Sequence, residues 1–309
     1  MNYGDLIKDA IRITWHNRYL WFFGFFVDLG SGGGGGGGGG DFDEQSSAEI
    51  ASIAPLAAQQ GVFDNVLLII AVILVVLLIF LVFFVFYVVS QGGLTESVAA
   101  IERGEPRRFS STWRAGTRYF WRVLGQVLLF VGIVIALLLA GGIPIALLVG
   151  GAFLTDSTAF KVLAVAMAVP VAIALLIVIF IPLAIVRQFA RRELVVQGVS
   201  VLGSVGTGYR LFRRNIGRSL LVWLIQLGIM LGAGIALIIA LIIVGLVLFL
   251  PTIFLAVAEY TTAAIVAGVV AGLILLPLLI VAVAILGTFN HSYWTLSYLR
   301  LAAGRVQPG

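Results

Sequence analysis

The stretch VLLIIAVILVVLLIFLVFFVFYVV, from Val66 to Val89, decides the fold class of this chain. It contains no charged residue and no polar stripe at helical spacing. About 20 such residues in a helix cross the hydrocarbon core of a bilayer, and helices of soluble domains keep one polar face. The stretch therefore predicts a transmembrane helix.

The rest of the chain has the same character. Of its 309 residues, 61% are hydrophobic and 11% are charged, whereas a soluble domain has about 25% charged residues. Further charge-free apolar blocks occupy 123–154, 162–186, 219–258 and 260–289. We expect one all-α transmembrane bundle over 1–309, with spans at about 19–30, 66–89, 123–150, 162–186, 219–247 and 261–289.

The basic residues predict how these spans are oriented. Of the 19 Lys and Arg residues, all but Lys161 fall in 1–18, 90–122, 187–218 and the C-terminal tail. Basic loops stay on the cytoplasmic side of a membrane. Six crossings with both termini in the cytoplasm place all four basic segments on that side. The expected location is the bacterial inner membrane, which is a plasma membrane.

The first of the six predicted spans is short. Tyr19–Val27 reaches about 14 Å, which is half of the hydrocarbon core. Either the following glycines continue the helix, or the bilayer thins there, or the segment is re-entrant. Asp28 is intramembrane in the first case and an ordinary external residue if the span ends at Val27, which we favour. Residues 31–62, with nine consecutive glycines, are expected to form a flexible external loop.

An internal repeat accompanies the spans. The ten residues 116–125 align without gaps on 208–217, with five identities in the pattern G-x-R-x-F-x-R-x-x-G. Residues 1–18 fit the same frame more loosely, with Ala10 in the place of the first glycine. The pattern predicts three copies of one unit, in which a cytoplasmic amphipathic helix at the membrane surface leads into a helical hairpin.

A few polar residues inside or beside the predicted spans are candidate site residues. Gln126 and Gln226 lie near the start of their spans. One interpretation is that they line a polar cavity; the interpretation that we favour is that they form hydrogen bonds between helices. His291 follows Asn290 at the end of the last span. It could act as a ligand or proton relay, but we favour a structural role. Asp28 belongs to the same set of possible intramembrane polar residues.

Four repeated arginines, Arg118, Arg122, Arg210 and Arg214, are candidate contacts for anionic lipid headgroups. Each arginine near an anionic membrane surface contributes about 1 kcal/mol to binding. Nucleic acid is the other polyanion that basic patches bind, but the bilayer lies only a few residues away, so we expect no nucleic-acid partner. No catalytic, cofactor or metal site is expected, because the chain has no cysteine and no cluster of acids, bases or nucleophiles.

Three motifs suggest a family: the opening IRITWxNRYLWFFGF, the two GxRxFxRxxG stretches, and the closing YWTLSYLRL. Together they resemble a group of uncharacterised bacterial six-span proteins, which are similar to the membrane domain of some glycerophosphoryl diester phosphodiesterases. The catalytic barrel of those phosphodiesterases has no counterpart here. The resemblance therefore implies a membrane module without hydrolase activity, and it transfers no functional residue.

These patterns lead to two hypotheses about function. The first is a non-enzymatic membrane organiser or accessory subunit that contacts lipid and unknown protein partners. The alternative is a transporter or permease-like protein for a small or lipidic substrate, since prolines 144, 170, 182 and 277 fall within spans and broken helices mark some transporter sites.

Overall fold

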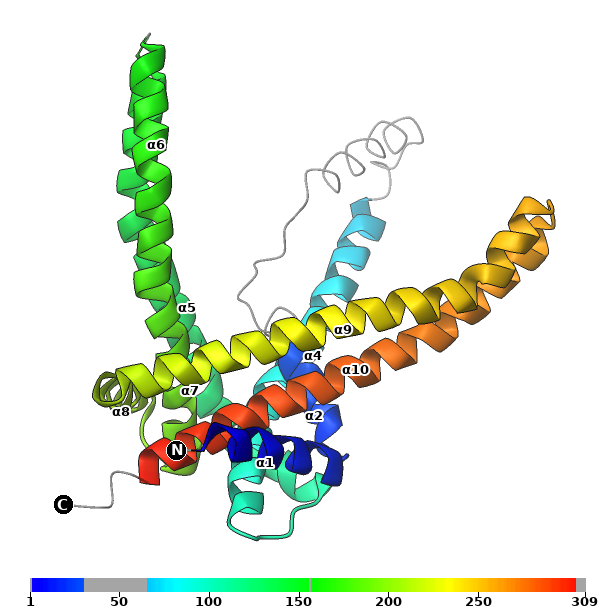
Figure 1. Ribbon diagram of the computed structural model, residues 1–309, viewed down its shortest axis with the longest axis horizontal. Coiled ribbons are helices and arrows are strands. Elements are labelled where there is room, and N and C mark those ends of the chain that lie inside the picture. Colours follow the sequence, from blue (N-terminus) through cyan, green and yellow to red (C-terminus); the bar gives the residue numbers. More distant parts are fainter. Residues whose placement is uncertain (1, 31–65, 156, 304–309) are drawn as a thin grey trace.

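The computed structural model describes residues 2–30, 66–155 and 157–303, and the regular elements in these ranges are helices (Figure 1). They are α1 (Tyr3–His16), α2 (Leu20–Gly30), α4 (Val66–Glu102), α5 (Phe109–Phe153), α6 (Thr158–Leu175), the π-helical turn η2 (Leu176–Phe180), α7 (Ile181–Val196), α8 (Val201–Arg214), α9 (Ile216–Val257) and α10 (Thr261–Ala303). The all-α prediction is confirmed.

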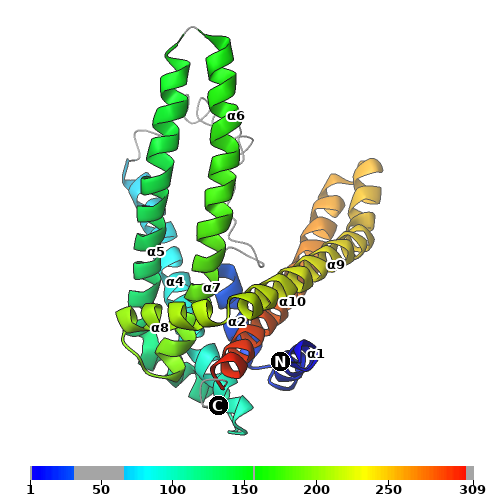
Figure 2. The same cartoon turned by 60° about the vertical axis from the view of Figure 1, so that its left-hand side comes forward.

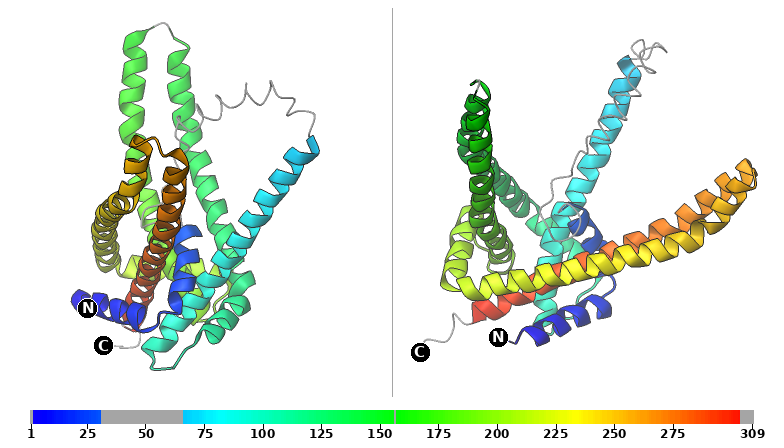
Figure 3. Two further views of the ribbon diagram at one scale, coloured as in Figure 1. Left: turned by 90° about the vertical axis from the view of Figure 1, so that its right-hand side faces the viewer. Right: turned by 45° about the horizontal axis from the view of Figure 1, so that its top comes forward.

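Three arms diverge from one hub (Figures 1 and 3). One arm is α4, the second pairs α5 with α6 and α7, and the third pairs α9 with α10 (Figure 2). The hub consists of α1, α2, α7 and α8 with the adjoining ends of α4, α5 and α10. It holds the main hydrophobic core, whose fully buried members include Leu6, Phe23, Phe189 and Trp294.

Five helices are long and apolar enough to cross a membrane. They are Ile69–Glu102, Phe109–Phe153, Thr158–Val196, Ile216–Val257 and Thr261–Ala303. In the first of them, every residue from 70 to 83 is exposed, although nearly all are large and apolar. An exposed apolar surface of this extent is unfavourable in water, whereas lipid tails can cover it. The chain is accordingly a multi-pass membrane protein.

The first predicted span, at 19–30, is not confirmed as a crossing. A helix does form there, but α2 has 11 residues and is about 16 Å long, whereas the hydrocarbon core is about 30 Å thick. It packs between α10 and α4 instead of standing apart as an arm (Figure 1). The predicted flexible loop at 31–62 lies outside the described residues.

Two of the three expected amphipathic surface helices are separate elements. In α1, Asn2 caps the first turn, and the buried side chains are Leu6, Ala10, Ile13 and Thr14. In α8, Ser200 is the cap, and the buried residues are Ser204, Gly208, Leu211 and Phe212. The third segment, before residue 123, differs from expectation because it is continuous with the span in α5.

The turns and kinks follow from local chemistry. The last two long helices are separated at Glu259, as predicted, and this residue adopts the left-handed conformation with φ of 63°. The four span prolines lie within helices and do not end them. Pro182 has no N–H to donate to the preceding turn, and the π-helical turn η2 lies directly before it.

Small residues allow α2 and α10 to approach closely. A Cβ atom added to Gly24 would lie 2.6 Å from the backbone nitrogen of Thr288. One added to Gly287 would lie 2.8 Å from the Cβ atom of Asp28. The Thr288 hydroxyl lies 3.2 Å from the carbonyl oxygen of Leu20 and 2.7 Å from that of Ala284. This contact joins the N-terminal segment to the last helix.

Candidate functional site

Polar side chains from α4, α7 and α10 meet inside the hub. Each helix contributes a pair at i, i+4 spacing, which places both members on one face. This buried polar cluster consists of Gln91 and Thr95 from α4, Gln188 and Arg192 from α7 with the neighbouring Arg191, and His291 and Thr295 from α10. The helices that supply the pairs belong to three different arms.

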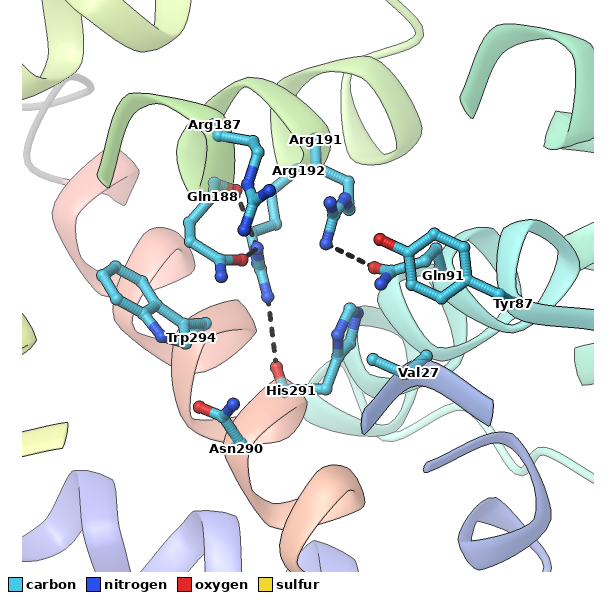
Figure 4. A pocket seen from close by; sticks show the side chains of 10 residues that line it. All are labelled: Val27, Tyr87, Gln91, Arg187, Gln188, Arg191, Arg192, Asn290, His291 and Trp294. Atoms are coloured by element: carbon cyan, nitrogen blue, oxygen red, sulfur yellow. Dashed lines mark hydrogen bonds between the residues drawn. The ribbon is translucent and has the colours of Figure 1, made fainter. Parts of the chain in front are cut away.

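The cluster borders a small, partly open cavity of about 30 Å³ (Figure 4). A cavity of this volume has room for about two water molecules. The described residues that line it are Val27, Tyr87, Gln91, Arg187, Gln188, Arg191, Arg192, Asn290, His291 and Trp294. The lining therefore includes three arginines and no carboxylate.

The two buried arginines are held by neutral groups. Arg191 donates from Nη1 to Oε1 of Gln91. Arg192 donates from Nη1 to the carbonyl oxygen and to Oε1 of Gln188, at 2.7 and 2.6 Å, and from Nη2 to the carbonyl oxygen of His291 at 3.4 Å (Figure 4). These contacts orient both guanidinium groups without neutralising either charge.

The Thr95 hydroxyl joins the His291 ring of α10 to α4. The hydroxyl oxygen lies 2.8 Å from the carbonyl oxygen of Gln91 and 2.9 Å from Nε2 of His291. Both contacts are buried, so they hold the His291 ring in one position at the side of the cavity.

Burial makes the positive charge of this cluster costly. Arg191 is 5% exposed, and Arg192 is fully buried. The ion pairs within the described part of the chain involve other arginines, namely Arg12, Arg103, Arg107 and Arg300. Glu193, the next residue in α7, is buried as well but does not line the cavity. A buried cation without a paired anion is destabilising by several kcal/mol.

Two donors at the cavity have no hydrogen-bond partner among the described residues. They are Nε of Arg191 and Nε1 of the Trp294 indole, both on buried residues. Buried donors in native proteins are almost always satisfied by protein, water or ligand. The cavity thus combines unneutralised positive charge with unused hydrogen-bond donors.

Residues 15–305 match a family of unknown function, DUF7544. The chain belongs to the DUF7544 family. The match begins at the end of α1 and ends just after α10, so it covers all three arms and the hub except most of α1. No curated protein and no solved structure matches the chain. None of the comparisons shows the expected similarity to the membrane domain of glycerophosphoryl diester phosphodiesterases.

Both predicted glutamines of this DUF7544 protein form the interhelical hydrogen bonds that the sequence favours. Gln126 of α5 donates to Oγ of Ser204 in α8 at 3.4 Å. Gln226 of α9 donates to Oδ1 of Asn290 in α10 at 3.0 Å. Neither lines the cavity.

Asp28 differs from the favoured interpretation, whereas the structural role favoured for His291 stays a prediction. Asp28 is 5% exposed and packs against Gly287 of α10, so it is not an ordinary exposed loop residue. His291 is accompanied by two arginines and a threonine, which lie far away in sequence. Within 2–30, 66–155 and 157–303, no three His, Asp or Glu side chains gather as metal ligands would.

The four predicted lipid contacts, Arg118, Arg122, Arg210 and Arg214, are all exposed and lie outside the cavity. Sequence reasoning missed Arg191 and Arg192, which it counted among the arginines that set topology. One sequence pattern could have identified them. Gln188 and Arg192 are polar residues at i, i+4 spacing near the end of a returning helix, and the ends of α4 and α10 carry similar polar pairs.

Proposed function

We propose that this DUF7544 protein is a non-enzymatic membrane organiser that binds anionic lipid headgroups at the cytoplasmic surface of the bacterial inner membrane. One observation carries the proposal: exposed arginines alternate with exposed aromatic side chains at the hub ends of apolar arms. On α5, Trp121 is 78% exposed and lies between Arg118 and Arg122. On α8, Tyr209 is 51% exposed and precedes Arg210.

This composition suits the headgroup region of a bilayer. Trp and Tyr favour that level of the membrane, and arginines there attract anionic lipid. Within the described residues, none of the four arginines forms an ion pair, and the one hydrogen bond is from Arg122 to the carbonyl oxygen of Gly198 at 3.5 Å. Their charges are therefore available to lipid phosphates.

The proposal includes six crossings, with α2 as a short crossing and both termini in the cytoplasm. Packing supports the threefold repeat that this topology needs. Gly116 of α5 packs against Val89 of α4, and Gly208 of α8 packs against Ala190 of α7. Ala10, in the corresponding place of α1, is fully buried, and α1 packs against α10. Each amphipathic segment thus contacts the returning helix of another unit.

The test compares the intact protein with the variant R118Q/R122Q/R210Q/R214Q in nanodiscs of mixed phosphatidylglycerol and phosphatidylcholine. Native mass spectrometry of the lipids retained on release gives the enrichment in phosphatidylglycerol. We expect severalfold lower enrichment in the variant, because each arginine contributes about 1 kcal/mol. K161Q, which neutralises the one basic residue outside the four basic segments, is the control and should leave enrichment unchanged. Equal enrichment in all three proteins would contradict the proposal.

A transporter is the second candidate, and η2 is the observation in its favour. A π-helical turn in a span loosens the backbone near Pro170 and Pro182, and such turns often occur at functional sites. The cavity at the polar ends of the helices, away from their apolar middles, favours the first function. Because the chain has no cysteine, single cysteines introduced at 176–180 can be tested with a membrane-impermeant thiol reagent. Labelling would support a water-lined path, and its absence would count against transport.

A further inference from the structure

We propose that the cavity between α4, α7 and α10 is a binding site for one phosphate group, carried by an anionic phospholipid or free in solution. The site is separate from the four exposed arginines, and the inference does not depend on their function.

Charge is the first argument. Arg187, Arg191 and Arg192 line one cavity of about 30 Å³, and the described residues bring no carboxylate to it. Two of these side chains are at least nine-tenths buried. A bound anion would offset the cost of their burial, which the neutral partners Gln91 and Gln188 do not.

Hydrogen-bond geometry is the second argument. Arg191 uses Nη1 for Gln91, and within the described part of the chain its Nε and the Nε1 of Trp294 have no hydrogen-bond partner. Guanidinium groups present N–H donors in a fork that matches two oxygens of a phosphate. In Figure 4 the guanidinium groups of Arg187, Arg191 and Arg192 all lie on one side of the cavity, with His291 opposite. An anion in this space would meet donors from two helices.

Size and access define the ligand further. Space for about two water molecules also accepts two oxygens of one phosphate group. The remainder of the ligand would lie at the mouth, where Arg187 is exposed and Gln188 is half-buried. The last exposed apolar side chain of α4 is Val85, less than two turns before Gln91. The cavity is thus at the depth where lipid phosphates lie beside an apolar helix.

The experiment uses the full chain in a nonionic detergent. Thermal unfolding is followed by tryptophan fluorescence while inorganic phosphate replaces chloride at constant ionic strength, which separates binding from screening. We expect phosphate to raise the unfolding temperature in a saturable way. R191Q and R192Q should weaken the apparent affinity roughly 10- to 100-fold, as expected for the loss of a charged hydrogen bond.

Two milder variants keep the test valid if the buried arginine variants fail to fold. R187Q changes an exposed residue at the mouth, and W294F keeps an aromatic ring but removes the free Nε1 donor. Each should weaken phosphate binding roughly 3- to 10-fold. K161Q, which changes a basic residue outside the cavity and outside the four exposed arginines, is the control and should bind phosphate as the intact protein does.

A second arm identifies the source of the phosphate group. Nanodiscs of phosphatidylglycerol and of phosphatidylcholine are compared, and tightly retained lipid is measured by native mass spectrometry. Retained phosphatidylglycerol that is lost in R187Q and W294F indicates a lipid headgroup. A response to inorganic phosphate without such retention indicates free phosphate. The inference is overturned if neither probe binds the intact protein, or if W294F and R187Q bind both probes as it does.

Discussion

The close contact between α2 and α10 gives the sharpest prediction of stability. Gly287→Ala adds a methyl group that would lie 2.8 Å from the Cβ atom of Asp28 and 3.0 Å from the carbonyl carbon of Gly24. One of these neighbours is backbone, which cannot rotate away. Gly272→Ala is the matched control in the same helix, because a Cβ atom there has nothing within 4 Å.

The two substitutions share one favourable term and differ in one unfavourable term. Replacing glycine by alanine inside a helix stabilises it by about 0.5–1 kcal/mol at both positions. Overpacking at Gly287 alone costs about 1–3 kcal/mol. The difference between the two variants isolates the steric term, and it corresponds to a difference in unfolding temperature on the order of 5 °C.

The assay is thermal unfolding of both variants in one detergent, followed by tryptophan fluorescence. Gly287→Ala should unfold at a lower temperature than the intact protein, and Gly272→Ala at the same or a slightly higher temperature. Gly24→Ala, whose methyl group would lie 2.6 Å from the nitrogen of Thr288, should behave like Gly287→Ala. If both alanine variants of α10 unfold together, α2 does not pack on α10 as described.

Three further predictions concern single contacts and topology. Gln226→Leu should lower the free energy of unfolding by about 0.6–1.7 kcal/mol through the lost bond to Asn290, and a double-mutant cycle with Asn290→Ala that gives no coupling would contradict this. Tyr293→Phe should lower it by about 0.5–1.5 kcal/mol, because the buried hydroxyl donates to the carbonyl oxygen of Val222 at 3.0 Å; unchanged stability would show that this bond contributes nothing. Reporter tags at residue 2 and within 41–60 should lie on opposite sides of the membrane, and a shared side would rule out a crossing by α2.

Much of the architecture was predictable from hydrophobic pattern. Apolar runs such as Val66–Val89 exceed the thickness of a bilayer, so they specify spans whatever their neighbours are. The amphipathic patterns predicted helices at 1–18 and before residue 219, and α1 and α8 form there as separate helices.

The buried cluster was not predictable in this way, because its members come from helices far apart in the chain. Arg191 binds Gln91, and Thr95 binds His291, over separations of 100 and 196 residues. Periodicity identifies the buried face of one helix, but it does not identify which other helix packs against that face. For that reason Arg191 and Arg192 were grouped with exposed topology-setting residues.

The sequence by itself determined that this chain is helical and enters a membrane, since both follow from local composition and the length of apolar runs. Only the tertiary structure decided where α2 lies and which polar ends meet. Those outcomes depend on close approach at Gly24 and Gly287 and on three helix ends that converge on Arg191 and Arg192. Contacts of this kind are set by the packing of whole helices, which no single segment specifies.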